Sequence, residues 1–155
     1  MQFLDARRLT GPSLLFDTHG SVLDIACSAE AAERLVPAWK RHVERMLAEI
    51  GWRDARFAVA KLRGGVSLGF TAPLDALYAA SAINEWAWSA CEHELNGADA
   101  PDFSTALAGI REGIAEEANP ALVDLEARAA ANGVTMLWDD DHVSLGLGRY
   151  SETWP

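Results

Sequence analysis

The pattern of apolar and polar residues begins with two apolar-rich runs in residues 13–27, SLLFDTHGSVLDIAC. His19-Gly20 lies between the runs, and glycine supplies the positive φ that a tight turn needs. In the second run Leu23 and Ile25 are two positions apart, so they share one face of a strand. The stretch therefore predicts a β-hairpin with its turn at His19-Gly20.

A helix pattern follows over residues 28–51. Ser28 is a suitable N-cap, because its hydroxyl can accept a hydrogen bond from the first turn, and Gly51 is a suitable stop. Pro37 predicts a kink or a restart, because proline lacks the backbone N–H. The apolar residues that recur at spacings of three and four are Leu35, Trp39, Val43, Met46 and Ile50. They predict one buried helix face.

The hairpin signal and the helix signal then occur a second time. Residues 55–73 contain two alternating runs around Gly64-Gly65, which predicts a second hairpin. The helix that follows, residues 73–95, carries only Asp75 and Glu85 as charges as far as Cys91. A helix this apolar is expected to be buried nearly all round. Its two tryptophans, Trp86 and Trp88, point to different faces and are expected to be core or interface residues.

The last third of the chain predicts two acidic helices and a short strand pair. Residues 96–103 form a loop and a weak boundary, and Pro120 and Gly133 mark the start and end of the second helix. Residues 134–138 and 142–148 are typical of short strands. We therefore expect one α+β domain over residues 1–155: two hairpin–helix units forming a mainly antiparallel sheet packed on helices, with a C-terminal helical segment and a short strand pair.

The net charge of −10 lies entirely in the C-terminal part of the chain. Residues 1–90 carry ten acids and ten bases, and residues 91–155 carry thirteen acids and three bases. This balance argues against a nucleic-acid partner, whose binding requires neutralised phosphates. The acidic part could attract a cationic substrate, or it could simply form solvated helix faces. No long apolar run predicts a membrane span, and no apolar leader is present, so a cytoplasmic location is expected.

The three carboxylates Asp139, Asp140 and Asp141, followed by His142, raise the question of a metal site. Consecutive residues point in different directions, and a calcium loop would need alternate ligands, a glycine and a distant glutamate. Aspartate also tolerates turn dihedrals. The hairpin-turn interpretation is therefore preferred to a metal site.

Other candidate motifs lack a necessary residue. Gly146-Leu147-Gly148 is not a dinucleotide fingerprint, and the chain's two lysines, Lys40 and Lys61, do not lie in a phosphate loop. We therefore expect neither an ATP site nor a cofactor. Glu92-His93-Glu94 lacks the second histidine of a zinc-protease motif and predicts a solvated helix end.

Two features remain as candidates for substrate binding. Basic residues cluster around the second hairpin and could hold an anion or a carboxylate, or could serve solubility alone. Glu85, a lone carboxylate on an apolar helix, must be paired, exposed or functional. The candidate substrate-binding residues are Glu85, Arg56, Lys61, Arg63, Asp139, Asp140 and Asp141, and Arg53 lies beside the basic group.

The segment RRLTGPSLLF, residues 7–16, carries a T-G-P element just before an apolar run. It resembles the opening of the N-terminal domain of cyanophycin synthetases and related Mur-ligase proteins, where an R-G-P or T-G-P element precedes the first strand. AINEWAWSACEHEL is similar to the family's apolar helix with a glutamate, here Glu85, although Trp86 stands where the family often has histidine. Residues 119–155 resemble a helix and strands that end in G-x-G-x-Y.

The resemblance implies a substrate-handling domain without catalytic machinery of its own. Cyanophycin synthetases are ATP-dependent ligases that build an aspartate–arginine polymer, and their catalytic sites lie in later domains. The expected partners are ligase catalytic domains or a subunit, and a peptide or amino-acid substrate. The alternative is a free-standing interaction module, self-associating through its tryptophan-rich helix. A third hypothesis is a small enzyme or metal protein that uses Glu85, His93 or His142.

Overall fold

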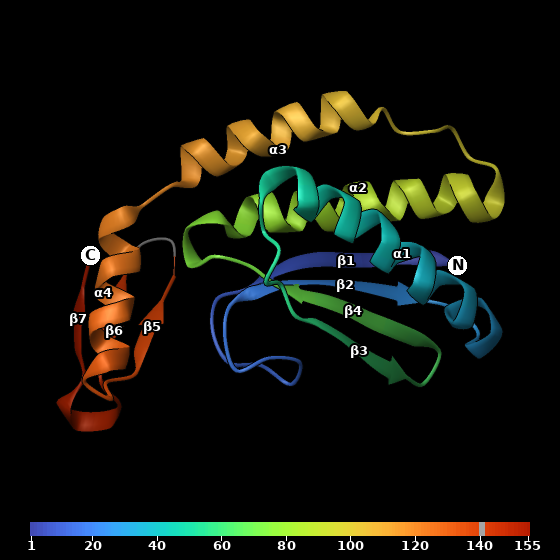
Figure 1. Cartoon of the computed structure of the whole chain (residues 1–155). Coiled ribbons are helices and arrows are strands. Elements are labelled where there is room, and N and C mark those ends of the chain that lie inside the picture. Colours follow the sequence, from blue (N-terminus) through green and yellow to red (C-terminus); the bar gives the residue numbers. More distant parts are fainter. Residues whose placement is uncertain (140–141) are drawn as a thin grey trace.

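A computed structural model describes residues 1–139 and 142–155, and it confirms the α+β fold. Four strands form an antiparallel sheet in the order β1-β2-β4-β3 (Figure 1). Their bounds are β1 Gln2–Leu9, β2 Gly20–Ala26, β3 Phe57–Leu62 and β4 Gly65–Thr71. The predicted second hairpin is β3–β4, and Gly64 (φ 86°) makes its turn.

Helices α1, Ala29–Ile50, and α2, Leu77–Asn96, cover one face of this sheet (Figure 1). Alternate residues of the central strands point toward the helices, as the period of two requires, so Leu23, Ile25 and Leu68 are fully buried. From α1 the predicted apolar face is buried at Leu35, Trp39, Val43 and Met46. The core therefore lies between the sheet and these two helices.

The ends of α1 form as the sequence predicts, but the helix does not restart at Pro37. The Ser28 hydroxyl accepts a hydrogen bond from Ala31 N at 3.2 Å, and Gly51 adopts φ 85°. Pro37 lies inside one continuous helix, so the predicted restart at this position is wrong. Pro37 is exposed, which leaves room for water to satisfy the carbonyl that loses its partner.

The first predicted hairpin is wrong in its boundaries. The partner of β2 is β1, which comes from the extreme N-terminal residues, and residues 10–19 form the connection. Gly20 does not make the turn; a Cβ there would lie 2.3 Å from the Phe70 carbonyl oxygen, so glycine is needed for close strand approach. The apolar run at residues 13–16 is not a strand, because Leu15 and Phe16 instead pack over Gly69.

The C-terminal part consists of two helices and a second, small sheet. The helices are α3 Phe103–Glu117 and α4 Pro120–Ala131, and the strands are β5 Met136–Trp138, β6 Val143–Leu145 and β7 Glu152–Trp154. The predicted strand pair is β5–β6, and β7 adds a third antiparallel strand that the sequence did not predict. Two short 3-10 turns complete the chain, Leu74–Ala76 before α2 and Gly148–Tyr150 before β7.

Polar contacts join this C-terminal part to the start of α2. The Glu117 carboxylate accepts hydrogen bonds from Tyr78 N at 2.7 Å and Ala79 N at 2.6 Å, and so caps α2 from a distant element. In return, Asp75 accepts a hydrogen bond from Asn119 N at 2.9 Å. His19 Nδ1 lies 3.2 Å from a carboxylate oxygen of Glu126 on α4.

The structure also bears on the membrane-span prediction and on the two cysteines. Within the described residues, no helix combines the length and the apolar character that crossing a membrane requires. Cys27 and Cys91 are both free thiols; Cys91 is buried and Cys27 is half-buried. Burial raises the pKa of the Cys91 thiol to about 12.

Candidate functional site

The predicted basic cluster is split between the two ends of β3. Arg56 precedes the strand, and Arg63 follows it, seven residues later in a nearly extended chain. At a rise of about 3.3 Å per residue, the two backbone positions are roughly 20 Å apart. Arg56 donates a hydrogen bond to Asp17 at 2.5 Å, and this bond holds the pKa of Asp17 below its ordinary value. Arg56 therefore does not share a patch with Lys61 and Arg63.

The Lys61 end of β3 carries two exposed cations that, unlike Arg56 at the other end, form no ion pair within the described residues. β3 is an edge strand of its sheet, and Lys61 and Arg63 are exposed. Among the described residues, neither cation is in an ion pair. Lys61 also lines a pocket of about 170 Å³ with Gly64-Gly65 and with Ser28 and Ala29 at the start of α1. The positive end of the α1 dipole therefore faces the same pocket as Lys61.

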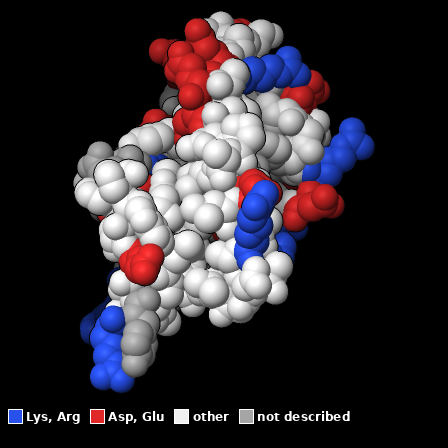
Figure 2. All heavy atoms as spheres, turned by 90° about the vertical axis from the view of Figure 1, so that its left-hand side faces the viewer, with Lys and Arg blue, Asp and Glu red and all other residues white. Residues whose placement is uncertain are grey.

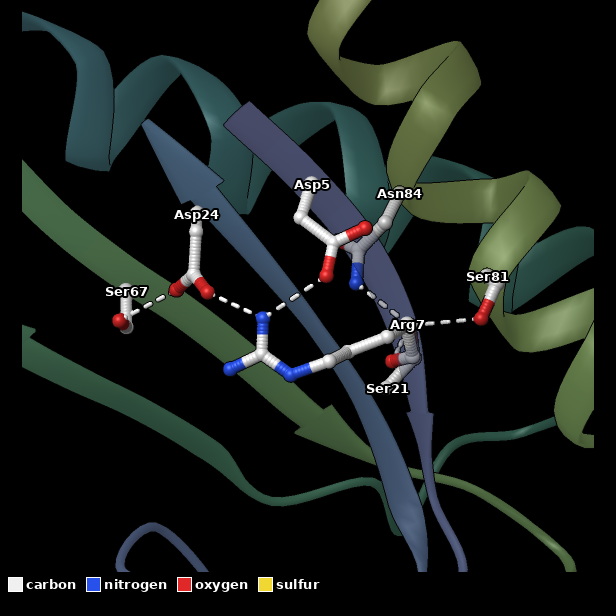
Figure 3. A network of polar contacts seen from close by, with 7 residues as sticks. All are labelled: Asp5, Arg7, Ser21, Asp24, Ser67, Ser81 and Asn84. Carbon is white, nitrogen blue, oxygen red and sulfur yellow. Dashed lines mark hydrogen bonds and ion pairs between the residues drawn. The ribbon is translucent and has the colours of Figure 1, made fainter. Parts of the chain in front are cut away.

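A charged network lies on the face of the sheet away from the helices (Figure 3). Arg7 on β1 lies between two carboxylates: it donates to Asp24 on β2 and, at 3.1 Å, to Asp5. The Ser67 hydroxyl on β4 donates to the other oxygen of Asp24. The bond to Asp24 raises the pKa of Arg7 despite partial burial. Sequence reasoning missed this network, because it did not predict β1 and therefore did not place Asp5 and Arg7 on one face of a strand.

A second branch of polar contacts lies on the helix-facing side (Figure 3). The buried Asn84 amide donates to the Ser21 hydroxyl at 2.9 Å, and its carbonyl accepts from Trp39 Nε1 at 2.9 Å. Ser81 lies 3.3 Å from Ser21. Because these buried groups satisfy one another, they fix how α2 sits on β2.

The structure places Glu85 on the exposed side of α2, where its carboxylate reaches solvent. Trp86 and Trp88 contact different elements, as predicted. Trp88 packs near Phe3 of β1, with ring centroids 6.4 Å apart, whereas Trp86 packs near Phe103 of α3 at 5.4 Å. Both tryptophans are buried within the chain.

Of the predicted turn at the acidic run, the structure describes the two flanking residues, Asp139 and His142, and they are hydrogen-bonded to each other. Asp139 N donates to the His142 carbonyl at 3.0 Å, and the Asp139 carboxylate accepts from His142 N at 2.8 Å. Asp140 and Asp141 lie outside the described residues. In the described part of the chain, no three His, Cys, Asp or Glu side chains are grouped to hold a metal ion. His93 lies on α2, whereas His142 lies in the connection between β5 and β6.

Comparison with known proteins assigns the chain to no family. Neither a scan against protein-family models nor a search of curated proteins finds a match to the chain.

Proposed function

We propose that the chain is a non-catalytic substrate-handling domain or subunit of a cyanophycin-synthetase-like or Mur-type peptide ligase, and that it holds an acidic peptide along β3. One observation carries this proposal: an open edge strand ends in two exposed cations, Lys61 and Arg63, that no carboxylate within the described residues pairs. The sequence resemblance supplies the ligase context.

The physical basis is strand addition. An extended peptide can hydrogen-bond to the outer backbone groups of an edge strand, and side chains at alternate positions then provide specificity. Carboxylates of the bound peptide would meet Lys61 and Arg63 through charge-assisted hydrogen bonds. The adjacent start of α1 favours negative charge at the same end.

This role requires no bond to be made or broken by the chain itself. A domain that holds a peptide close to a ligase site raises the effective concentration of the reacting end there. The acidic C-terminal helices offer a second contact surface; Figure 2 shows acidic side chains gathered at the top, where α3 lies. Of the acids on α3, Glu112 and Glu116 are exposed.

The alternative function, self-association through the tryptophan-rich helix, has less support. Trp86 and Trp88 are 8% and 7% exposed, so neither provides surface for a second copy. Light scattering over a range of concentrations tests this alternative, because it measures whether the molar mass rises above that of one chain.

The test is binding of a dye-labelled oligo-aspartate peptide, followed by fluorescence anisotropy. Replacing Lys61 and Arg63 together by glutamine should weaken binding by about tenfold, a modest loss because the charges are exposed. The matched control replaces Arg111 and Arg128 by glutamine. These residues are exposed on α3 and α4, and the change should leave the affinity for the peptide almost unchanged. Equal losses in both variants would indicate a general charge effect and would contradict the proposal, as would the absence of binding.

A further inference from the structure

A pocket of about 330 Å³ lies between α1, α2 and the start of α3, on a part of the molecule separate from Lys61. Its wall combines aromatic rings, small apolar residues and charged groups. The residues that matter for its chemistry are His42, Arg45, Trp86, His93, Glu94 and Phe103. The volume falls in the range of sites that bind small organic molecules.

Trp86 has a hydrogen-bond donor without an acceptor. Its side chain is 8% exposed, and its indole Nε1 is the one buried side-chain nitrogen or oxygen of the described residues that has no partner. Trp39, another indole in the core, donates to Asn84 at 2.9 Å. Because buried donors in proteins are almost always paired, the unpaired Trp86 N–H needs an explanation.

Arg45, which also lines this pocket, brings a charged donor to it. Its guanidinium lies 3.8 Å from the centre of the Phe103 ring, and no described ion pair includes it. The nearby carboxylate, Glu94, is already engaged by Arg41 and by His42 Nε2 at 2.9 Å. Burial would raise the pKa of Glu94, but these bonds lower it below its ordinary value. Glu94 is therefore ionised and already paired with Arg41 and His42, so it does not neutralise the positive charge of Arg45.

His93 holds the loop that forms the last wall of the pocket. Its Nδ1 lies 2.6 Å from the carbonyl oxygen of Ala98, so Nδ1 carries the proton and donates it. This bond ties the connection after α2 to the helix, and Pro101 of the same connection lines the pocket. The segment that the sequence indicated as a weak boundary, residues 96–103, thus forms part of the pocket wall.

We propose that this pocket binds a small organic carboxylate with an apolar, aromatic body. The carboxylate would accept from Arg45 and from the Trp86 indole, and the body would pack on Phe103, Ala90 and Pro101. A cationic ligand would be repelled by Arg45. A purely hydrocarbon ligand would leave the indole N–H unpaired. Binding requires the side chains that cover Nε1 to shift, and Phe103, at the first position of α3, is the nearest aromatic ring to Trp86.

The probe is 3-phenylpropionate, titrated into the ¹⁵N-labelled chain, with 3-phenylpropionamide as the uncharged isostere. The expected result is a saturable shift of one indole N–H resonance, assigned to Trp86 by its loss in Trp86→Phe. The amide should bind at least about tenfold more weakly, because it cannot pair with the guanidinium. A shift that never saturates, or equal affinity for the acid and the amide, would overturn the proposal.

Arg45→Gln provides the second arm, and it serves even if Trp86→Phe does not fold, because Arg45 is exposed at the rim. It should reduce carboxylate affinity by about tenfold, whereas Arg34→Gln, an exposed position on the same helix, should not. Unchanged affinity in Arg45→Gln would also overturn the proposal. The Lys61 and Arg63 double variant should retain carboxylate binding, so failure of the peptide proposal and failure of this one give different results.

Discussion

The sheet with α1 and α2, residues 1–96, and the C-terminal part, residues 103–155, are stabilised in different ways. The first contains nearly all the buried hydrophobic residues, whereas the second contributes only Ile110, Leu122 and Ala129 among the described residues. The second is attached mainly through α3, which packs on α2, and through polar contacts near the start of α2. The hydrophobic effect therefore holds the first region together, whereas the second depends on the apolar contact of α3 with α2 and on specific hydrogen bonds near the start of α2.

The largest effect should come from Trp39→Ala in the first region. Trp39 is fully buried and donates to Asn84, so its loss leaves a cavity and an unpaired amide oxygen. We expect the free energy of unfolding to fall by about 3–5 kcal/mol in denaturant titration. Trp154→Ala is the matched control, because Trp154 is 44% exposed on β7. Similar losses for the two tryptophans would contradict the contrast between the regions.

Glu117→Ala should break the attachment of the second region. It removes the carboxylate that accepts from Tyr78 N and Ala79 N at the start of α2. We expect a loss of about 1–2 kcal/mol in unfolding free energy, the range of a lost helix cap, together with faster proteolysis of residues 97–102. The neighbouring Glu116→Ala, at an exposed position, should change neither quantity. Equal behaviour of the two variants would show that the cap is not an important attachment.

His19 should make the stability of the fold sensitive to pH. Burial lowers the pKa of His19 below its ordinary value of 6.5, although Glu126 opposes this effect. The unfolded chain therefore binds the proton more readily, and the stability contributed by neutral His19 is present above pH 6.5 and is lost as pH falls through the folded pKa. Thermal unfolding at a series of pH values should show this loss in the native chain and less of it in His19→Gln. His142→Gln, at an exposed position, is the control.

The smallest effect is expected at the surface of α4. Asp124 and Arg128 form an exposed ion pair at 2.8 Å, one helical turn apart. Asp124→Ala should cost only about 0.3–0.5 kcal/mol, and added salt should reduce that difference further. A loss comparable to that of Glu117→Ala would mean that α4 contributes more to stability than its few buried residues indicate.

The fold was predictable where local signals agreed with burial. The second hairpin and the ends of α1 follow directly from Gly64, Ser28 and Gly51. β1 was not predictable, because it is an exposed edge strand whose residues, including Asp5 and Arg7, do not alternate between apolar and polar. The apolar run at residues 13–16 suggested a strand, but long-range packing of Phe16 on Gly69 decided its conformation.

The candidate sites were less predictable, because they depend on residues far apart in the sequence. Lys61 and Arg63 stay candidates, predicted from their position beside a hairpin turn, whereas Arg56 lies at the other end of β3 and was wrongly grouped with them. The aromatic pocket brings Arg45, Trp86 and Phe103 together from three helices. Its clearest signal, an indole N–H without an acceptor, exists only in three dimensions.

The bonds from Tyr78 N and Ala79 N to Glu117 also have a consequence for the order of events during synthesis. The two partners are 39 and 38 residues apart, so the start of α2 leaves the ribosome well before the carboxylate that caps it. The four-stranded sheet can therefore pair its strands while the first turn of α2 still has open backbone donors. Translation pauses after residue 96 would lengthen that interval, and the first turn of α2 would complete its hydrogen bonding only when α3 arrives.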